Sequence, residues 1–227
     1  LGTVVNPITA NYQVCFRCHG DSLNQLPPRT PRQIIQPNIR LQFDTINPAY
    51  HPVAGIGKNP NVPSLIAPWT TSSMMACTDC HGSDNGSSKP HGSTFAPILK
   101  QQYITTDRTP ESPAAYALCY SCHDRNSILG DQSFMEHRRH IVGENSPCNN
   151  CHMPHGNSAA AGATIANNSK LINFRTDVVT PNGGVLMFTS TGLFSGSCTL
   201  TCHGEAHNNE TYGNAVAPPV VVPPPVV

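Results

Sequence analysis

Residues 119–156 read CYSCHDRNSILGDQSFMEHRRHIVGENSPCNNCHMPHG and contain two copies of one pattern, C-x-x-C-H. This spacing is the attachment signature of c-type haem. One turn of chain carries two thiols for the two vinyl groups of the porphyrin, and the next histidine lies beneath the ring and binds the iron. A single C-x-x-C pair also suits a zinc knuckle or a redox dithiol, but neither of these requires the histidine that follows.

The pattern recurs along the rest of the chain. All ten cysteines fall into five pairs, and each pair is followed at once by histidine. Four pairs have the regular spacing, which predicts four covalent haems. Their thioether cysteines are Cys15 and Cys18, Cys77 and Cys80, Cys119 and Cys122, and Cys148 and Cys151. Their iron-binding histidines are His19, His81, His123 and His152.

The fifth pair, Cys198-Thr-Leu-Thr-Cys202-His203, has one additional residue between the cysteines. Two interpretations fit it. A bulged turn accommodates the extra residue and a fifth haem binds, or the two thiols form a local disulfide, which persists outside the cytoplasm. In the second case His203 and His207 become free to act as distal ligands of other haems.

Six further histidines remain as candidates for the distal face of each iron: His51, His91, His137, His140, His155 and His207. They supply enough imidazoles for four or five haems without methionine, and two imidazoles close each iron to substrates. His137 and His140 share one helical face, and His140 is preferred if only one of them binds. His155 is too near His152 to reach round the same haem, so it must bind a neighbouring one.

A ligand donated across a subunit boundary should lie far in sequence from the motif that it serves. His51 lies in a proline-rich loop and is the first choice for this role, although an exposed loop histidine is the simpler alternative. His207 is the second choice.

Composition predicts the fold class. Only 38% of the 227 residues are apolar, 6% are aromatic and 22 are proline, so the side chains alone build a poor core. We expect a mostly irregular, haem-wrapped multihaem cytochrome with short helices near the cysteine pairs and a few short strands. Residues 1–210 form one domain, and residues 211–227 form an extended tail rich in proline and valine. The segments LINFRTDVV and VLMFTST read as two strands of a hairpin joined by TPNGG.

Charge and hydropathy restrict the partners. Charged residues are 11% of the chain and balanced, 13 basic against 13 acidic, without a basic stripe for nucleic acid. No apolar run is long enough to span a membrane. The sequence starts at Leu1 rather than methionine, which fits an exported chain after removal of a signal peptide. Haem attachment takes place outside the cytoplasmic membrane, so we expect an extracellular or cell-surface location, with the periplasm as the alternative.

The segments CTDCHGSDNGSSKPHG, CYSCHD…HRRH…CNNCHMPHG and CTLTCHGEAHNN resemble those of multihaem c-type cytochromes with doubled C-x-x-C-H motifs from metal-reducing bacteria. In size and motif number the chain looks most like the extracellular, nanowire-forming cytochromes of the OmcE type, over about residues 15–210. This resemblance implies stacked haems with two histidine ligands each, a ligand that crosses between subunits, and a homopolymeric filament.

Such a filament exchanges electrons with other redox proteins or extracellular acceptors. A monomeric periplasmic electron shuttle with the same haems is the alternative. An enzyme such as a multihaem nitrite reductase is disfavoured, because no C-x-x-C-K motif occurs and the spare histidines close every iron.

Overall fold

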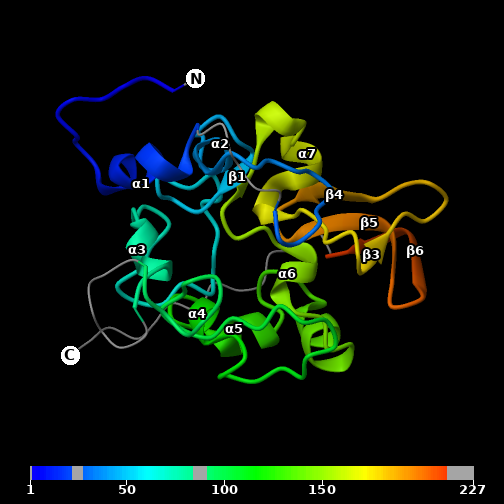
Figure 1. Cartoon of the computed structure of the whole chain (residues 1–227). Helices are drawn as coiled ribbons and strands as arrows, with labels where there is room; N and C mark the ends of the chain where they lie inside the picture. Colours follow the sequence, from blue (N-terminus) through cyan, green and yellow to red (C-terminus); the bar gives the residue numbers. More distant parts are fainter. Residues whose placement is uncertain (1, 22–27, 84–90, 214–227) are drawn as a thin grey trace, which may run out of the picture.

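A computed structural model describes residues 2–21, 28–83 and 91–213 of the chain. Most of these residues lie in turns and irregular segments, interrupted by short helices and short strands (Figure 1). The prediction of an irregular fold with few regular elements is confirmed. Residues 214–227 of the predicted tail lie outside the described part. Thr211 and Tyr212 belong to a strand of the main sheet.

The helices are short because proline and glycine interrupt most segments. The α-helices are α1 (Asn11–His19), α2 (Ile39–Gln42), α3 (Cys77–Cys80), α4 (Ala117–Tyr120), α5 (Arg125–Leu129), α6 (Cys148–Cys151) and α7 (Ile165–Asn168). A π-helix, η1 (Arg139–Gly143), and two 3₁₀ turns, η2 (Ala159–Ala161) and η3 (Ser169–Leu171), complete the set.

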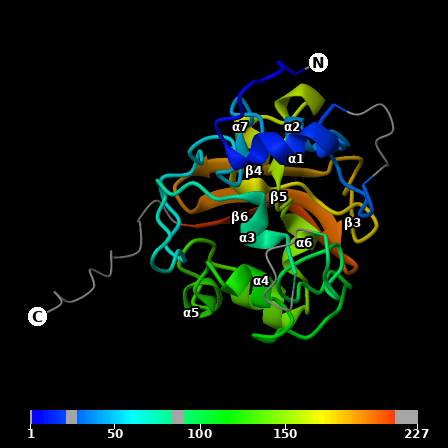
Figure 2. The same cartoon turned by 60° about the vertical axis from the view of Figure 1, so that its left-hand side comes forward.

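The strands form two antiparallel sheets. The small sheet pairs β1 (Ala49–Tyr50) with β2 (Gly156–Asn157). The larger sheet contains β3 (Val179–Thr180), β4 (Met187–Gly192), β5 (Ser195–Cys202) and β6 (Glu205–Tyr212). β5 is central, with β6 on one side and with β4 and β3 following one another along its other side (Figures 1 and 2).

The predicted hairpin across TPNGG is wrong in its pairing. Of the first segment only Val179 lies in a strand, β3, and both β3 and β4 pair with β5 rather than with each other. A single bridge joins Asn182 to Val185 across the predicted turn. The partner strand β5 contains the fifth cysteine pair, for which the sequence predicts either a haem-binding turn or a local disulfide. Tertiary pairing with this longer strand therefore overrides the local turn signal.

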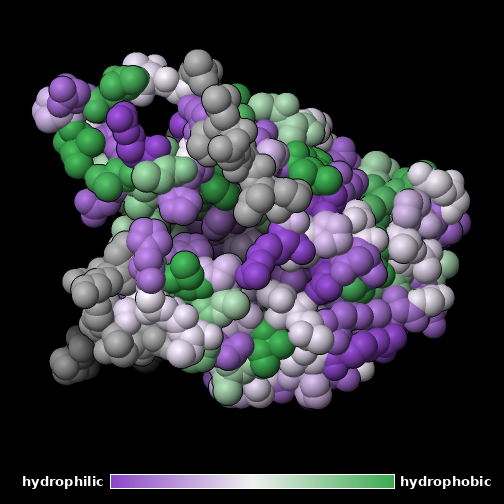
Figure 3. Space-filling model, in the orientation of Figure 1, coloured by the Kyte–Doolittle hydropathy of each residue, from purple (hydrophilic) through white to green (hydrophobic). Residues whose placement is uncertain are grey.

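Apolar burial is limited, as the composition predicts. One cluster contains Ala115, Tyr116, Leu129 and Ile141, and a second, which we call the sheet cluster, contains Phe174, Val179, Phe188 and Leu200. Green apolar residues in Figure 3 are scattered among polar ones rather than joined into one face. Several exposed apolar side chains belong to the segment that leads into α1 and stands away from the body, among them Val4, Val5 and Ile8.

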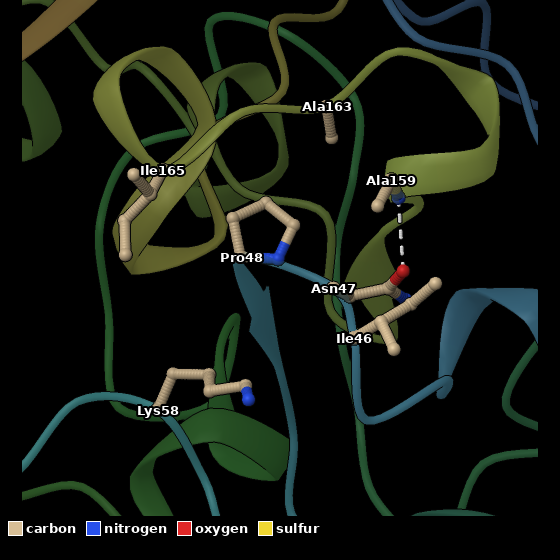
Figure 4. A pocket seen from close by; sticks show the side chains of 7 residues that line it. All are labelled: Ile46, Asn47, Pro48, Lys58, Ala159, Ala163 and Ile165. Carbon is tan, nitrogen blue, oxygen red and sulfur yellow. Dashed lines mark hydrogen bonds between the residues drawn. The ribbon is translucent and has the colours of Figure 1, made fainter.

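Buried polar side chains hold the loops together. Arg32, 6% exposed, donates from Nη1 to the carbonyl oxygens of Asn149 at 2.6 Å and Asn173 at 2.8 Å. Asn47 Oδ1 accepts a hydrogen bond from the Ala159 amide at 2.9 Å, beside a shallow cavity of about 210 Å³ near Lys58 (Figure 4). Loop segments that are distant in sequence are thus joined by single amide and guanidinium groups, because buried backbone groups need partners.

Candidate haem sites

Each regular motif forms a helical turn that places its two cysteines on one face. In α3 and α6 the helical turn is the C-x-x-C sequence itself. The histidine that follows caps each helix with nearly the same backbone dihedral angles, which are φ −100° and ψ 136° at His81 and φ −101° and ψ 135° at His152. The histidine amide donates to the carbonyl of the first cysteine at 2.9 Å in both motifs, and at 3.0 Å for His123. This geometry presents two thiols and one imidazole together.

A distant segment anchors each of these three histidines. Antiparallel bridges join His81 to Leu99, His123 to Leu65 and His152 to Ile172. The same segments bind the ring Nδ1 atoms, at 3.2 Å to the Ile98 carbonyl, 2.8 Å to Ser64 Oγ and 3.1 Å to the Lys170 carbonyl. An Nδ1–H that is held in this way leaves Nε2 as the free ligand atom, as in most metal-binding histidines.

Across from each motif histidine lies one of the spare histidines. The ring centroids are 6.2 Å apart for His19 and His91, 6.0 Å for His81 and His155, 6.5 Å for His123 and His51, and 6.4 Å for His152 and His137. The sequence did not indicate these pairings, three of which join residues more than 70 positions apart in the chain.

The spacing fits a metal ion between the two rings. A metal–imidazole bond is about 2.0 Å and the ring centre lies about 1.2 Å further back, so two imidazoles on opposite sides of one iron have centroids about 6.4 Å apart. The four pairs lie at 6.0–6.5 Å. The donor set, the ring spacing and the adjacent thiols therefore fit a c-type haem with two axial histidines at all four motifs.

The small sheet places two distal histidines together. His51 follows β1 and His155 precedes β2, and the His51 amide donates to the His155 carbonyl at 2.9 Å. His51 Nδ1 contacts the Pro154 carbonyl, and His155 Nδ1 bonds Gln42 Oε1 at 2.7 Å. One two-residue ladder thus positions the two spare histidines that lie opposite the second and third motif histidines.

Two expectations about these histidines have different outcomes. His155 lies opposite His81 rather than beside His152, the placement that a ligand for a neighbouring haem requires. His51 was the first choice for a ligand donated to another subunit, but the structure places it opposite His123 of the same chain. The pairing of β1 with β2 holds His51 inward, which the proline-rich sequence around it did not indicate.

Contacts between the thiols order the four sites. Burial and then the nearby Cys15 raise the pKa of Cys77, and the nearby Cys148 together with burial raises the pKa of Cys119. Between these pairs, burial and then the nearby Cys122 raise the pKa of Cys80 to about 11. The thiols of each motif therefore lie near those of the next motif in the chain, and the four sites form a row.

Burial keeps the central imidazoles neutral. It lowers the pKa of His155 and His137 to about 3 and that of His123 and His152 to about 4. A neutral ring with a free Nε2 lone pair is the form that binds iron. The first site differs, because Cys18, His19 and His91 are all exposed and this end of the row lies open at α1.

The fifth cysteine pair has a different local structure. Cys198 and Cys202 lie on β5 rather than on a helical turn, and their thiols are free. Four residues of strand span about 13 Å, whereas a disulfide needs Cα atoms about 4.4–6.8 Å apart. The local disulfide considered from the sequence is therefore wrong for this fold.

The histidine of the fifth motif is held by a carboxylate. His203 occupies the turn after β5 with φ +51°, and its Nε2 lies 3.0 Å from both carboxylate oxygens of Asp107. Asp107, Ser64 and Gln42 were not singled out from the sequence. No local pattern marks them, because their partners lie about 60 to 110 residues away.

Comparison with known proteins supports the haem interpretation. A family model described as a doubled CXXCH motif matches residues 70–127, the part that contains the second and third motifs. The searches of curated proteins and of solved structures gave no match. The motifs support covalent haem c binding and fit a haem-binding, electron-transfer protein of the multihaem c-type cytochrome kind.

Two further findings concern the described part of the chain. None of its helices combines the length and apolar character needed to cross a membrane. It also holds no group of three or more His, Cys, Asp or Glu side chains arranged to bind a metal ion by themselves.

Proposed function

We propose that this chain is an electron-transfer subunit that carries its haems in one continuous row and assembles head to tail into an extracellular filament. The observation that carries the proposal is the set of four histidine pairs at 6.0–6.5 Å, each with one motif histidine and one distal histidine. Bound haem supplies one-electron exchange between ferric and ferrous iron.

In this proposal the polypeptide holds the haems in position and insulates them from solvent. The thiol contacts between successive motifs keep neighbouring sites adjacent, as electron transfer between them requires. Two imidazoles on each iron leave no position for a substrate and favour lower potentials than histidine–methionine ligation. Irons that are closed by two imidazoles argue against a catalytic role. Rapid binding of carbon monoxide by one reduced iron in the native protein would instead favour an enzyme.

The open end of the row supports head-to-tail assembly. The first site is exposed at α1, next to the apolar side chains of Val4, Val5, Ile8 and Val14, whereas the β5–β6 hairpin lies on another side of the molecule (Figure 1). A second copy that covers this end extends the row, and a heterologous contact of this kind builds an open filament. A monomeric periplasmic shuttle is the competing function, and electron microscopy of native material separates the two by the presence or absence of filaments.

Ligand replacement tests the proposed row. We expect His155→Ala to convert one iron, that of the second motif, from low-spin to high-spin without loss of covalent haem. Electron paramagnetic resonance and intact mass measure both properties. His91→Ala should do the same at the first site. If all irons in both variants stay low-spin, the histidine pairs are not the axial ligands and the proposed arrangement is wrong.

A further inference from the structure

A fifth pair of imidazoles has the same spacing as the other four. The rings of His140 and His207 have centroids 6.2 Å apart and planes 29° apart, although neither residue follows a cysteine pair. His140 Nδ1 bonds the Glu136 carbonyl at 2.7 Å, which leaves its Nε2 free in the manner of His81 and His152. The distance fits an iron between the rings as well as at the four motifs.

The sheet brings two thiols to the same place. Cys198, Leu200 and Cys202 alternate along β5 and share one face. Leu200 pairs with His207 on β6, and residues opposite one another in an antiparallel pair point to the same face. Both thiols and the His207 imidazole therefore face one side of the sheet.

The segment that carries His140 covers this face. The Phe134 ring packs against the His140 ring, with the ring centroids 5.7 Å apart, and against the Tyr212 ring of β6, with the ring centroids 4.5 Å apart. Tyr212, Cys198 and Cys202 all pack on the sheet cluster. His140 thus approaches the sheet face from above, opposite His207.

The row of motifs continues to this site. The four regular motifs lie next to one another in chain order. The second cysteine of the fourth motif, Cys151, packs on the same sheet cluster as Cys198 and Cys202. A fifth site here extends the row beyond the fourth motif, at the opposite end from α1.

We propose that the chain holds a fifth covalent haem c, attached through Cys198 and Cys202 and bound axially by His140 and His207. The inference rests on the proposed haem-binding function. It departs from the motif rule, because the histidine directly after Cys202, His203, has its Nε2 on Asp107.

The attachment balances without an oxidant. Each thiol adds across one vinyl group. The sulfur bonds to the carbon nearer the ring, the thiol hydrogen moves to the outer carbon, and the carbon–carbon double bond becomes single. The reaction requires both thiols in the reduced state.

Intact mass of the native, exported protein after acid denaturation is the first test, since acid removes non-covalent haem and leaves thioether-bound haem. We expect five haems in the native chain and four in the Cys198→Ala/Cys202→Ala variant. Four haems in the native chain overturn the fifth site and leave the proposed function standing, whereas a chain without covalent haem overturns the proposed function itself.

Spin state is the second test and uses His203 as the matched control. We expect His140→Ala and His207→Ala each to turn one of five irons high-spin, and His203→Ala to leave all irons low-spin. A high-spin iron in His203→Ala together with unchanged spectra in His207→Ala assigns the ligand to the motif histidine and overturns the proposed ligand pair.

Discussion

Three hydrogen-bond donors converge on the carboxylate of Glu111, near the third motif. Its carboxylate, 4% exposed, accepts from Arg125 Nε at 2.8 Å, Arg125 Nη2 at 2.5 Å and Tyr120 Oη at 3.0 Å. The hydrogen bonds from Arg125 are the main reason that the pKa of Glu111 is lowered from its ordinary value of 4.5. The pair links the segment before α4 to the start of α5.

This pKa shift predicts an acid-dependent stability. Because the folded pKa lies below the unfolded one, the stabilisation is fully present above about pH 4.5 and is lost as pH falls through the folded value. We expect Glu111→Gln to cost about 1 kcal/mol at pH 7, with Arg125 partly exposed, and to cost progressively less below pH 4. Denaturant midpoints of both proteins from pH 7 to pH 3 measure the difference, and a constant difference across this range contradicts the assignment.

Arg32 is a buried cation that joins three segments. Its two hydrogen bonds to the Asn149 and Asn173 carbonyls hold the turn of the fourth motif against the irregular segment around Asn173. We expect Arg32→Met to lower the free energy of unfolding by about 3 kcal/mol, because both buried carbonyls lose a charged donor. Arg29→Met is the matched control, since Arg29 is exposed. Equal costs in chemical denaturation for the two variants contradict this role.

At the scale of elements, the two-residue pairing of β1 with β2 positions two of the spare histidines, His51 and His155. Gly156 fits there because a Cβ atom would overlap the Gln42 carbonyl and lie 2.7 Å from Tyr50 Cβ. We expect Gly156→Ala to push the strands apart, shift His51 and His155 together, and make two irons partly high-spin at once. Overpacking of this kind costs about 1–3 kcal/mol.

Gly57→Ala is the control for this change, because a Cβ at Gly57 has no contact nearer than 4.0 Å. Resonance spectra of the two variants decide the outcome. High-spin character at a single iron in Gly156→Ala means that the two distal histidines are positioned independently, contrary to the ladder model.

At the scale of the whole molecule, the open first site is where assembly is expected to begin. We expect Val4→Ser/Val5→Ser to shorten or abolish filaments while leaving the haem count unchanged, because these side chains are 81% and 44% exposed beside α1. Ile165→Ser removes an equally exposed apolar side chain, 73% exposed, elsewhere on the surface and serves as control. Filament length by electron microscopy checks the prediction. Equal loss in both variants points to general solubility rather than a contact at α1.

The local chemistry of this protein follows directly from its amino-acid sequence. Two thiols and an imidazole within five residues form one helical turn, so the four regular motifs can be recognised from the sequence. The low apolar content predicts an irregular fold. Short-range geometry is carried by adjacent residues and needs no distant partner.

Which histidines face one another depends on the tertiary structure. The pairing of His51 with His123 depends on β1 meeting β2, and the pairing of His140 with His207 depends on β5 aligning Leu200 opposite His207. Such contacts close long loops whose ends are brought together by packing and buried hydrogen bonds, and no spacing in the sequence encodes them. The same reason explains His203. The motif rule made it a ligand candidate, and a carboxylate nearly one hundred residues away, Asp107, holds its Nε2 instead.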